Sequence, residues 1–170
     1  MFKQNQIYVP SEQFLKCVIS LCFLVAMSKI TIPISPVPIT MQTLSVLIVG
    51  YFLDKRSAFA VTFSYLILGI FLPVFSSSGF GISYLFFGYT SGYLLSFPFA
   101  AYAMSSLKNK NFYVAAFISL SIVFIPGILS LSYFIGFKAS VFMGGAIFII
   151  SESFKELLLK LLIKKFNLFF

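Results

Sequence analysis

The sequence has no histidine, and its 170 residues include only four acidic residues and two cysteines. Without histidine, the usual catalytic triads, imidazole acid–base chemistry and histidine metal sites are excluded. Cys17 and Cys22 lie in the first apolar segment without Cys-x-x-Cys spacing, so we interpret them as buried, inert thiols and expect no metal site. No G-x-x-x-x-G-K-[ST] motif is present, which excludes a P-loop for ATP.

Apolar residues, in contrast, are abundant. The chain is 60% hydrophobic, 19% aromatic and only 9% charged, with a mean hydropathy of +1.04. Charged residues make up about a quarter of an ordinary soluble domain, so the composition indicates a bilayer protein in contact with membrane lipid. A helical span needs ~20 apolar residues. We therefore predict an all-α membrane protein with six transmembrane helices in one integral domain, residues 1–170.

Prolines, glycines and charged residues divide the sequence into apolar segments. We predict spans over residues 14–34, 40–53, 57–72, 91–107, 112–129 and 151–166. Charged loops in water are expected at 54–56 and 108–111. Three prolines between residues 33 and 38 cannot continue a helix and predict an extended connector. A serine- and glycine-rich loop is expected over 74–92, and a loop with a short helix at the membrane face over 130–150.

The basic residues predict the orientation. The net charge is +8, and the lysines gather at the ends of the predicted spans, which the positive-inside rule explains better than a nucleic-acid partner. With both termini in the cytoplasm, nine of the twelve basic residues lie inside. This places a multi-pass protein in the cell membrane, with the connectors 31–40, 74–92 and 130–151 together at the outer face, where they could cover a pocket.

Glu152 and Lys155 are the first candidates for a binding site. They are three residues apart, so they share one face of the last predicted helix. Ionisable residues inside a membrane are costly and usually functional. Together they offer an anionic acceptor and a cationic donor at the mouth of a dry pocket. The alternative is a solvated charged stripe, because Glu156, Lys160 and Lys164 continue the same spacing.

Further candidates lie in the connectors. Gln42 and Thr43 follow the prolines and could bind a ligand or cap a helix. Hydroxyls and free backbone amides of the serine- and glycine-rich loop can bind a carboxylate, although such loops are more often flexible exterior segments. Its candidates are Phe75, Ser77, Gly79, Thr90, Ser91 and Tyr93. Cys22 and Ala26 have the small-xxx-small spacing that allows another helix to approach closely, although such spacing is common in apolar helices.

Four motifs in order resemble those of the BioY family, the biotin-binding S components of energy-coupling factor (ECF) transporters. Residues 32–44 (IPISPVPITMQTL) resemble the family's PVPxTxQTL, and residues 72–75 (LPVF) match its LPVF. Residues 88–94 (GYTSGYL) resemble GPTGGYL, with residues 97–101 at the following GFxxAA. Residues 148–155 (FIISESFK) align with FIPGDLxK.

The resemblance implies an ECF S-component fold with biotin bound near the outer face. It implies docking onto a transmembrane scaffold subunit, EcfT, that carries two ABC-type ATPases, with small residues of the first helix, here Cys22 and Ala26, at the contact. The family's biotin-contacting Asp and Lys fall on Glu152 and Lys155. The ureido ring would meet this pair, Phe75 or Tyr93 would flank the ring, and serine and threonine hydroxyls would bind the valerate carboxylate. Biotin is then a transported ligand, and no cofactor is expected.

The chain departs from the family pattern near the proposed site. Ile150 and Ser151 replace the Pro-Gly before the acidic residue, Tyr89 replaces a proline, and Ser91 replaces a glycine. One alternative is therefore an S component for another vitamin-like acid, such as lipoate or a dethiobiotin-like compound. A second is an intramembrane enzyme that uses the Glu152–Lys155 pair, which the absence of a nucleophile–base pair disfavours. A third is an assembly subunit that binds no small molecule.

Overall fold

Proline, glycine and polar turns divide the chain into helices in the computed structural model, which describes residues 10–33, 36–146, 152 and 155. The longer helices are α1 (Pro10–Ser28), α2 (Gln42–Phe52), α3 (Lys55–Phe71), α5 (Ser91–Leu107) and α6 (Phe112–Ile135). The shorter elements are β1 (Thr31–Ile32), β2 (Ile39–Thr40), η1 (Ser76–Ser78), α4 (Ile82–Phe87), α7 (Phe137–Val141) and the π-helix η2 (Phe142–Ala146). The prediction of a mainly helical chain is confirmed for these residues.

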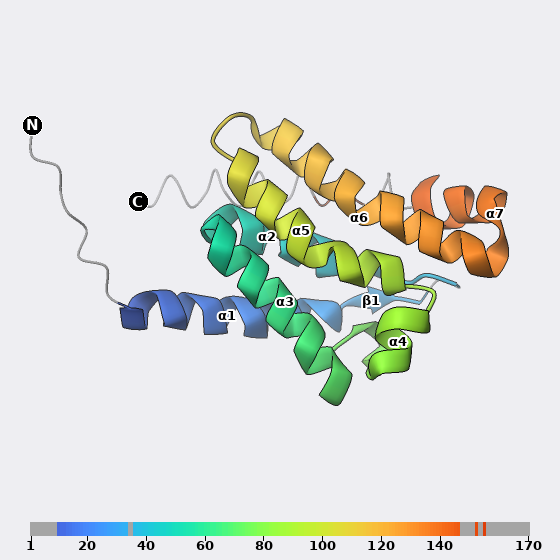
Figure 1. Cartoon of the computed structure of the whole chain (residues 1–170), viewed down its shortest axis with the longest axis horizontal. Helices are drawn as coiled ribbons and strands as arrows, with labels where there is room; N and C mark the ends of the chain where they lie inside the picture. Colours follow the sequence, from blue (N-terminus) through green and yellow to red (C-terminus); the bar gives the residue numbers. More distant parts are fainter. Residues whose placement is uncertain (1–9, 34–35, 147–151, 153–154, 156–170) are drawn as a thin grey trace, which may run out of the picture.

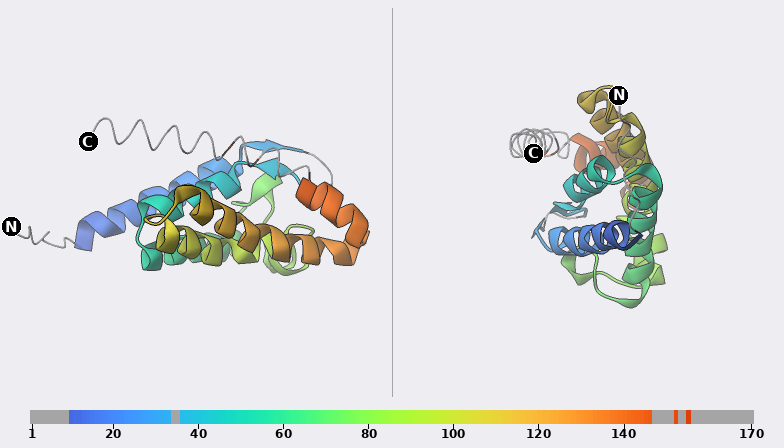
Figure 2. Two further views of the ribbon diagram at one scale, coloured as in Figure 1. Left: turned by 90° about the horizontal axis from the view of Figure 1, so that it is seen from above. Right: turned by 90° about the vertical axis from the view of Figure 1, so that its left-hand side faces the viewer.

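The longer helices run along the long axis of the molecule, and different segments gather at its two ends (Figure 1). The start of α1, the α2–α3 turn and the α5–α6 turn lie at one end, which we call the charged-turn end. The β1–β2 ribbon, α4 and α7 lie at the other end, the ribbon end, as the views in Figure 2 also show. Helix α5 is central, since it packs against α6, α3 and α2. The described parts of the three predicted connectors therefore share one end of the bundle.

Two described stretches, residues 55–78 and Phe112–Ile135, are long and apolar enough to cross a membrane. Helix α2 is apolar but shorter, with 11 residues. Of the predicted last span, 151–166, only Glu152 and Lys155 are described, and both have helical backbone. The rest of that span lies outside the described residues, so the count of six remains a prediction.

The first helix ends earlier than predicted. We expected it to continue to Ile34, but α1 ends at Ser28, and Thr31–Ile32 forms a strand. This strand pairs antiparallel with Ile39–Thr40, in the register Thr31–Thr40 and Ile32–Ile39. β-Branched residues favour such extended pairing. The expected extended connector is thus present, and its first strand begins at Thr31, two residues before Pro33.

Two predicted loops contain helices. The 74–92 segment includes η1 and α4, which are too short to give a periodic pattern in the sequence. Helix α6 does not stop near Leu129 as expected but continues to Ile135. It ends at Gly136, whose φ of 80° glycine adopts without strain. Helices α7 and η2 follow, in agreement with the expected short helix.

The cluster 54–56 is a helix start rather than a free loop. Asp54 is the N-cap of α3 and accepts hydrogen bonds from the amides of Arg56 and Ser57, at 3.0 and 3.1 Å. Gln13 of α1 donates a further bond to Asp54, at 2.9 Å. Partial burial acts to raise the pKa of Asp54, but the bonds from Ser57 and Arg56 outweigh it, and the pKa lies below its ordinary value. Asp54 therefore stays ionised and joins α1 to α3.

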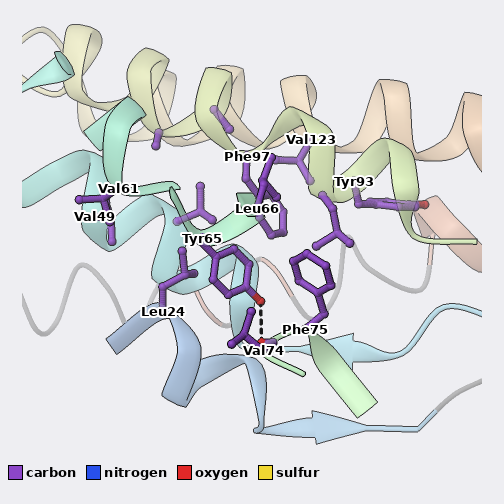
Figure 3. Close-up of a cluster of buried hydrophobic side chains, with 14 of the residues drawn as sticks. Leu24, Val49, Val61, Tyr65, Leu66, Val74, Phe75, Tyr93, Phe97 and Val123 are labelled. Carbon is purple, nitrogen blue, oxygen red and sulfur yellow. Dashed lines mark hydrogen bonds between the residues drawn. The ribbon is translucent and has the colours of Figure 1, made fainter. Parts of the chain in front are cut away.

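A cluster of aromatic residues fills the core beneath the ribbon end. Tyr65 and Phe75 are fully buried and meet edge to face, with ring centroids 5.4 Å apart (Figure 3). The Tyr65 hydroxyl donates to the Val74 carbonyl at 3.0 Å, the bond drawn in Figure 3. A Cβ at Gly69 would lie 1.9 Å from the Phe75 ring, so only glycine leaves room for it. These contacts hold the segment after α3 against the bundle, beside the candidate site.

Candidate functional site

A buried ion pair joins Glu152 and Lys155. Both residues are 3% exposed, and Lys155 Nζ lies 2.5 Å from Glu152 Oε1. Lys155 also donates to the Thr40 carbonyl at 2.6 Å and to Thr43 Oγ1 at 3.2 Å. Thr43 Oγ1 in turn donates to Glu152 Oε1 at 2.8 Å. A solvated stripe is therefore excluded for these two residues, which face strand β2 and the start of α2.

One carboxylate oxygen of this pair has no partner. Glu152 Oε2 is buried and accepts no hydrogen bond within the described part of the chain. Leaving a buried polar group unsatisfied costs about 1–3 kcal/mol, and more when the group is charged. Lys155, by contrast, uses its three donor positions on three oxygen acceptors. The pair is thus prepared to accept a hydrogen bond from a ligand that carries an N–H or O–H donor.

A small cavity lies beside this pair. Its volume is about 30 Å³, enough for water but far below the ~300–1,000 Å³ of typical small-molecule pockets. Its lining is mostly apolar with a few hydroxyl and amide groups: Val37, Pro38, Thr40, Gln42, Thr43, Ser76, Thr90, Tyr93, Leu94, Phe97 and Phe124. Thr40 and Thr43 both line the cavity and contact the ion pair. A vitamin-sized ligand would require the cavity to widen.

Four of the predicted site residues line this cavity. Gln42, Thr43, Thr90 and Tyr93 come from the start of α2 and the start of α5, at the ribbon end. Gln42 Nε2 donates to the Tyr65 hydroxyl at 2.6 Å, which holds its amide in place. The Tyr93 hydroxyl donates to the Gly144 carbonyl at 2.9 Å and so joins α5 to η2. The structure thus brings the first and third sequence motifs together around one cavity.

The other predicted residues of the 74–92 loop lie apart from the cavity. Phe75 is enclosed in the aromatic core, and Ser77 is exposed with a φ of 51°. A Cβ at Gly79 would lie 2.3 Å from the Tyr84 ring, so this glycine makes room for an aromatic contact. Ser91 is buried but bonds Ser130 at 2.6 Å. In this conformation none of the four lines the cavity: Phe75 and Gly79 serve packing, and Ser91 links α5 to α6.

Several lining residues were not predicted as contacts. Val37, Pro38, Leu94 and Phe97 belong to the quoted motifs but were not chosen, whereas Ser76 is one of the loop serines expected to donate to the valerate carboxylate. Their place inside the motifs could have indicated them. Phe124 lies in the middle of α6, where no feature of the sequence separates it from other apolar helix residues.

The cysteine prediction requires a correction. Cys22 is exposed and Cys17 is half-buried, so they are not the buried thiols expected from their apolar segment. Cys22 and Ala26 share an outward face of α1 with exposed Ile19. Among the described residues, no group of three or more His, Cys, Asp or Glu side chains could hold a metal ion.

The fold matches a solved structure along nearly its whole length. The crystal structure of an S-component for biotin from an ECF-type ABC transporter superposes with a TM-score of 0.83, covering 98% of this chain and 95% of that chain at 20% identity. The chain therefore has the fold of an ECF transporter S component. At this identity the likeness concerns the fold alone.

The sequence defines the family. The model of the BioY family matches residues 3–169, and the chain belongs to this family. A probable biotin transporter BioY of Rickettsia prowazekii is 34% identical over 149 residues, 84% of this chain and 77% of that protein. One from Pyrococcus horikoshii is 30% identical over 128 residues, 75% of this chain and 79% of that protein. Membership makes the chain a membrane transport protein rather than an enzyme, so the intramembrane-enzyme alternative is wrong.

Proposed function

We propose that this chain is the substrate-capture subunit of a biotin uptake transporter. It binds biotin at the outer face and delivers it inward, with partner ATPase subunits supplying the energy. Family membership and the names of the two relatives support the choice of biotin. The observation that carries the proposal is the buried Glu152–Lys155 pair, which bonds Thr40 and Thr43 of the first motif and keeps one carboxylate oxygen without a partner among the described residues.

The polar groups of biotin fit this arrangement. Its ureido ring carries two N–H donors, and Glu152 Oε2 offers a charged acceptor with no other partner in the described chain. The ureido carbonyl can accept from Lys155 once biotin replaces one of the three oxygens that Lys155 bonds without it, those of Thr40, Thr43 and Glu152. The hydroxyls of Ser76 and Thr90 line the same cavity and can donate to the valerate carboxylate. Tyr93 and Phe97 supply apolar surface for the fused rings.

Binding of labelled biotin to the purified chain in detergent tests this function. We expect saturable binding at one site that unlabelled biotin displaces and thiamine and riboflavin do not. Lipoate and dethiobiotin test the alternative of an S component for another vitamin-like acid. That alternative requires one of them to displace labelled biotin at a lower concentration than unlabelled biotin does. A folded sample that binds none of these acids would contradict the proposed function.

We also propose six spans with both termini in the cytoplasm, in the cell membrane. The charged-turn end would then face inward and the ribbon end outward. The basic residues Lys55, Arg56, Lys108 and Lys110 near the charged turns support this orientation through the positive-inside rule. The small cavity lies at the opposite end, between the start of α2 and the start of α5.

The outward face of α1 is proposed to dock onto the scaffold subunit EcfT, which carries the ATPases. Replacing the exposed Ala26 by leucine is expected to leave biotin binding within twofold of the unmodified chain, but to lower the amount of scaffold and ATPase that co-purifies. The physical reason is that a larger side chain at a small-residue helix contact holds the two helices apart. Co-purification from a cell that expresses all the subunits, together with biotin uptake, measures this effect.

Ala60 provides the matched control. It is exposed on α3, so Ala60→Leu adds the same side chain to a different outward surface. Equal losses of co-purification in both variants would reject α1 as the specific docking face.

A further inference from the structure

A second hollow lies far from the candidate site, between α3 and α5 near the charged-turn end. It is an open groove of about 460 Å³, lined by Arg56, Phe59, Phe99 and Tyr102. Phe59 and Phe99 meet edge to face at 5.8 Å and form its apolar surface. Phe99 is 61% exposed and Tyr102 43% exposed, so the groove opens on the outside of the bundle. None of its residues belongs to the proposed biotin site.

The charge of Arg56 is available to a ligand. Among the described residues, the ion pairs within 4.0 Å join only Lys16 to Glu12 and Lys155 to Glu152. The nearest acidic residue in the sequence, Asp54, accepts bonds from the α3 amides and from Gln13. The exposed guanidinium thus keeps its donors and most of its charge for another partner.

Helix stability does not account for the placement of Arg56. It lies in the first turn of α3, where the positive end of the helix dipole disfavours a cation. Lys55 precedes it and is also exposed, which adds to this unfavourable charge. The ionised N-cap Asp54 already offsets part of this cost, and a negatively charged partner at this point would offset more of it, because it would be attracted by both side chains and by the dipole.

We propose that this groove binds an anionic phospholipid of the leaflet that contacts the charged-turn end. Arg56 holds the phosphate through its planar fork of donors, which matches phosphate geometry, and Phe59, Phe99 and Tyr102 contact the glycerol and the upper acyl chain. An outward surface of a membrane protein meets lipid, and aromatic residues favour the interface between headgroups and hydrocarbon. Anionic headgroups attract basic residues at that interface.

Charge selects this occupant over a neutral lipid. The aromatic surface alone would accept any phospholipid, because acyl chains are the same in all of them. The guanidinium, which forms no ion pair with the residues that the structure describes, gives an anionic headgroup an advantage over a zwitterionic one, whose ammonium offsets its phosphate. Binding is therefore expected to depend on headgroup charge, on Arg56 and, to a smaller degree, on Phe99.

The test measures thermal unfolding of the purified full chain in a neutral detergent during titration with lipid. Phosphatidylglycerol is expected to raise the unfolding midpoint at a concentration at least fivefold lower than phosphatidylcholine. Arg56→Gln is expected to remove this preference, Arg56→Lys to keep part of it, and Phe99→Ala to weaken binding of both lipids. Native mass spectrometry of the same samples counts the lipids that remain bound.

Lys110→Gln is the matched control, since it removes one exposed positive charge at the same end but outside the groove. If Lys110→Gln lost the preference as completely as Arg56→Gln, the effect would be one of general charge and the proposal would be rejected. Equal responses to both lipids would also reject it. Inorganic phosphate that displaced phosphatidylglycerol at millimolar concentration would identify a soluble-anion site instead. A lipid-independent dimer that shields Arg56 would assign the groove to a second copy of the chain.

Discussion

Replacing Glu152 by glutamine or alanine is expected to weaken biotin binding more than tenfold and to leave the fold intact. Glu152 Oε2 is the buried acceptor that has no partner in the described chain. Glutamine keeps the shape of the side chain but replaces the charge by a neutral amide, which donates where the ureido N–H groups need an acceptor. Removing one partner of a desolvated, hydrogen-bonded charge pair costs about 2–5 kcal/mol, and tenfold in affinity is about 1.4 kcal/mol.

Equilibrium binding of labelled biotin measures the effect, and the thermal unfolding midpoint without ligand shows whether the variant is folded. Glu12→Gln is the control. Glu12 forms an exposed i,i+4 pair with Lys16 on α1, at 2.7 Å, so the same substitution there removes an ion pair of little energetic value. An unchanged affinity in a folded Glu152→Gln sample would remove Glu152 from the biotin site.

The ion pair also shows how far a sequence can predict a site. Spacing alone placed Glu152 and Lys155 on one helix face, but the same spacing fits a solvated stripe. Burial decides between the two, and burial depends on Thr40 and Thr43, more than a hundred positions earlier in the chain. Contacts at that separation leave no local pattern, and only the resemblance to a family gave a reason to connect them.

Helix ends were predictable where the residues themselves end a helix. The predicted span 91–107 coincides with α5, Ser91–Leu107, because a glycine-rich turn precedes it and a charged turn follows. The predicted end of α1 was wrong because Ile30, Ile32 and Ile34 continue the apolar run of the sequence past Ser28. The strand Thr31–Ile32 comes from pairing with Ile39–Thr40, which hydropathy does not report.

The aromatic residues of the 74–92 segment were predicted from the composition of the loop and from the family resemblance, and neither separates ligand contacts from core. Phe75 was placed against the ligand, but the structure encloses it between Tyr65, Tyr84 and the bare backbone of Gly69. Phe75 enters the core because Gly69 of α3 leaves room for its ring, and Gly69 lies outside Phe75's own motif. Tyr93 fits both descriptions, because its ring is part of the core and also lines the cavity.

Gly92 is the position where the smallest substitution is expected to have the largest effect on stability. A Cβ there would lie 2.2 Å from the carbonyl oxygen of Pro126 and 2.7 Å from Ser130 Cβ, so the backbones of α5 and α6 touch at this point. By helix propensity alone, alanine would stabilise α5 by about 1 kcal/mol over glycine. Overpacking costs about 1–3 kcal/mol, and here the obstacle is backbone, which cannot rotate away as a side chain can.

Gly92→Ala is therefore expected to lower the thermal unfolding midpoint in detergent by several degrees, because 1 kcal/mol corresponds to about 2–4 °C in a chain of this length. It should also weaken biotin binding, since pushing α5 away from α6 displaces Thr90 and Tyr93 at the cavity. Gly145→Ala is the control: its Cβ would first meet Ile128 Cδ1 at 3.1 Å, the movable end of a side chain. A midpoint that rises in Gly92→Ala would mean that propensity outweighs the clash, and that α5 and α6 can separate without loss.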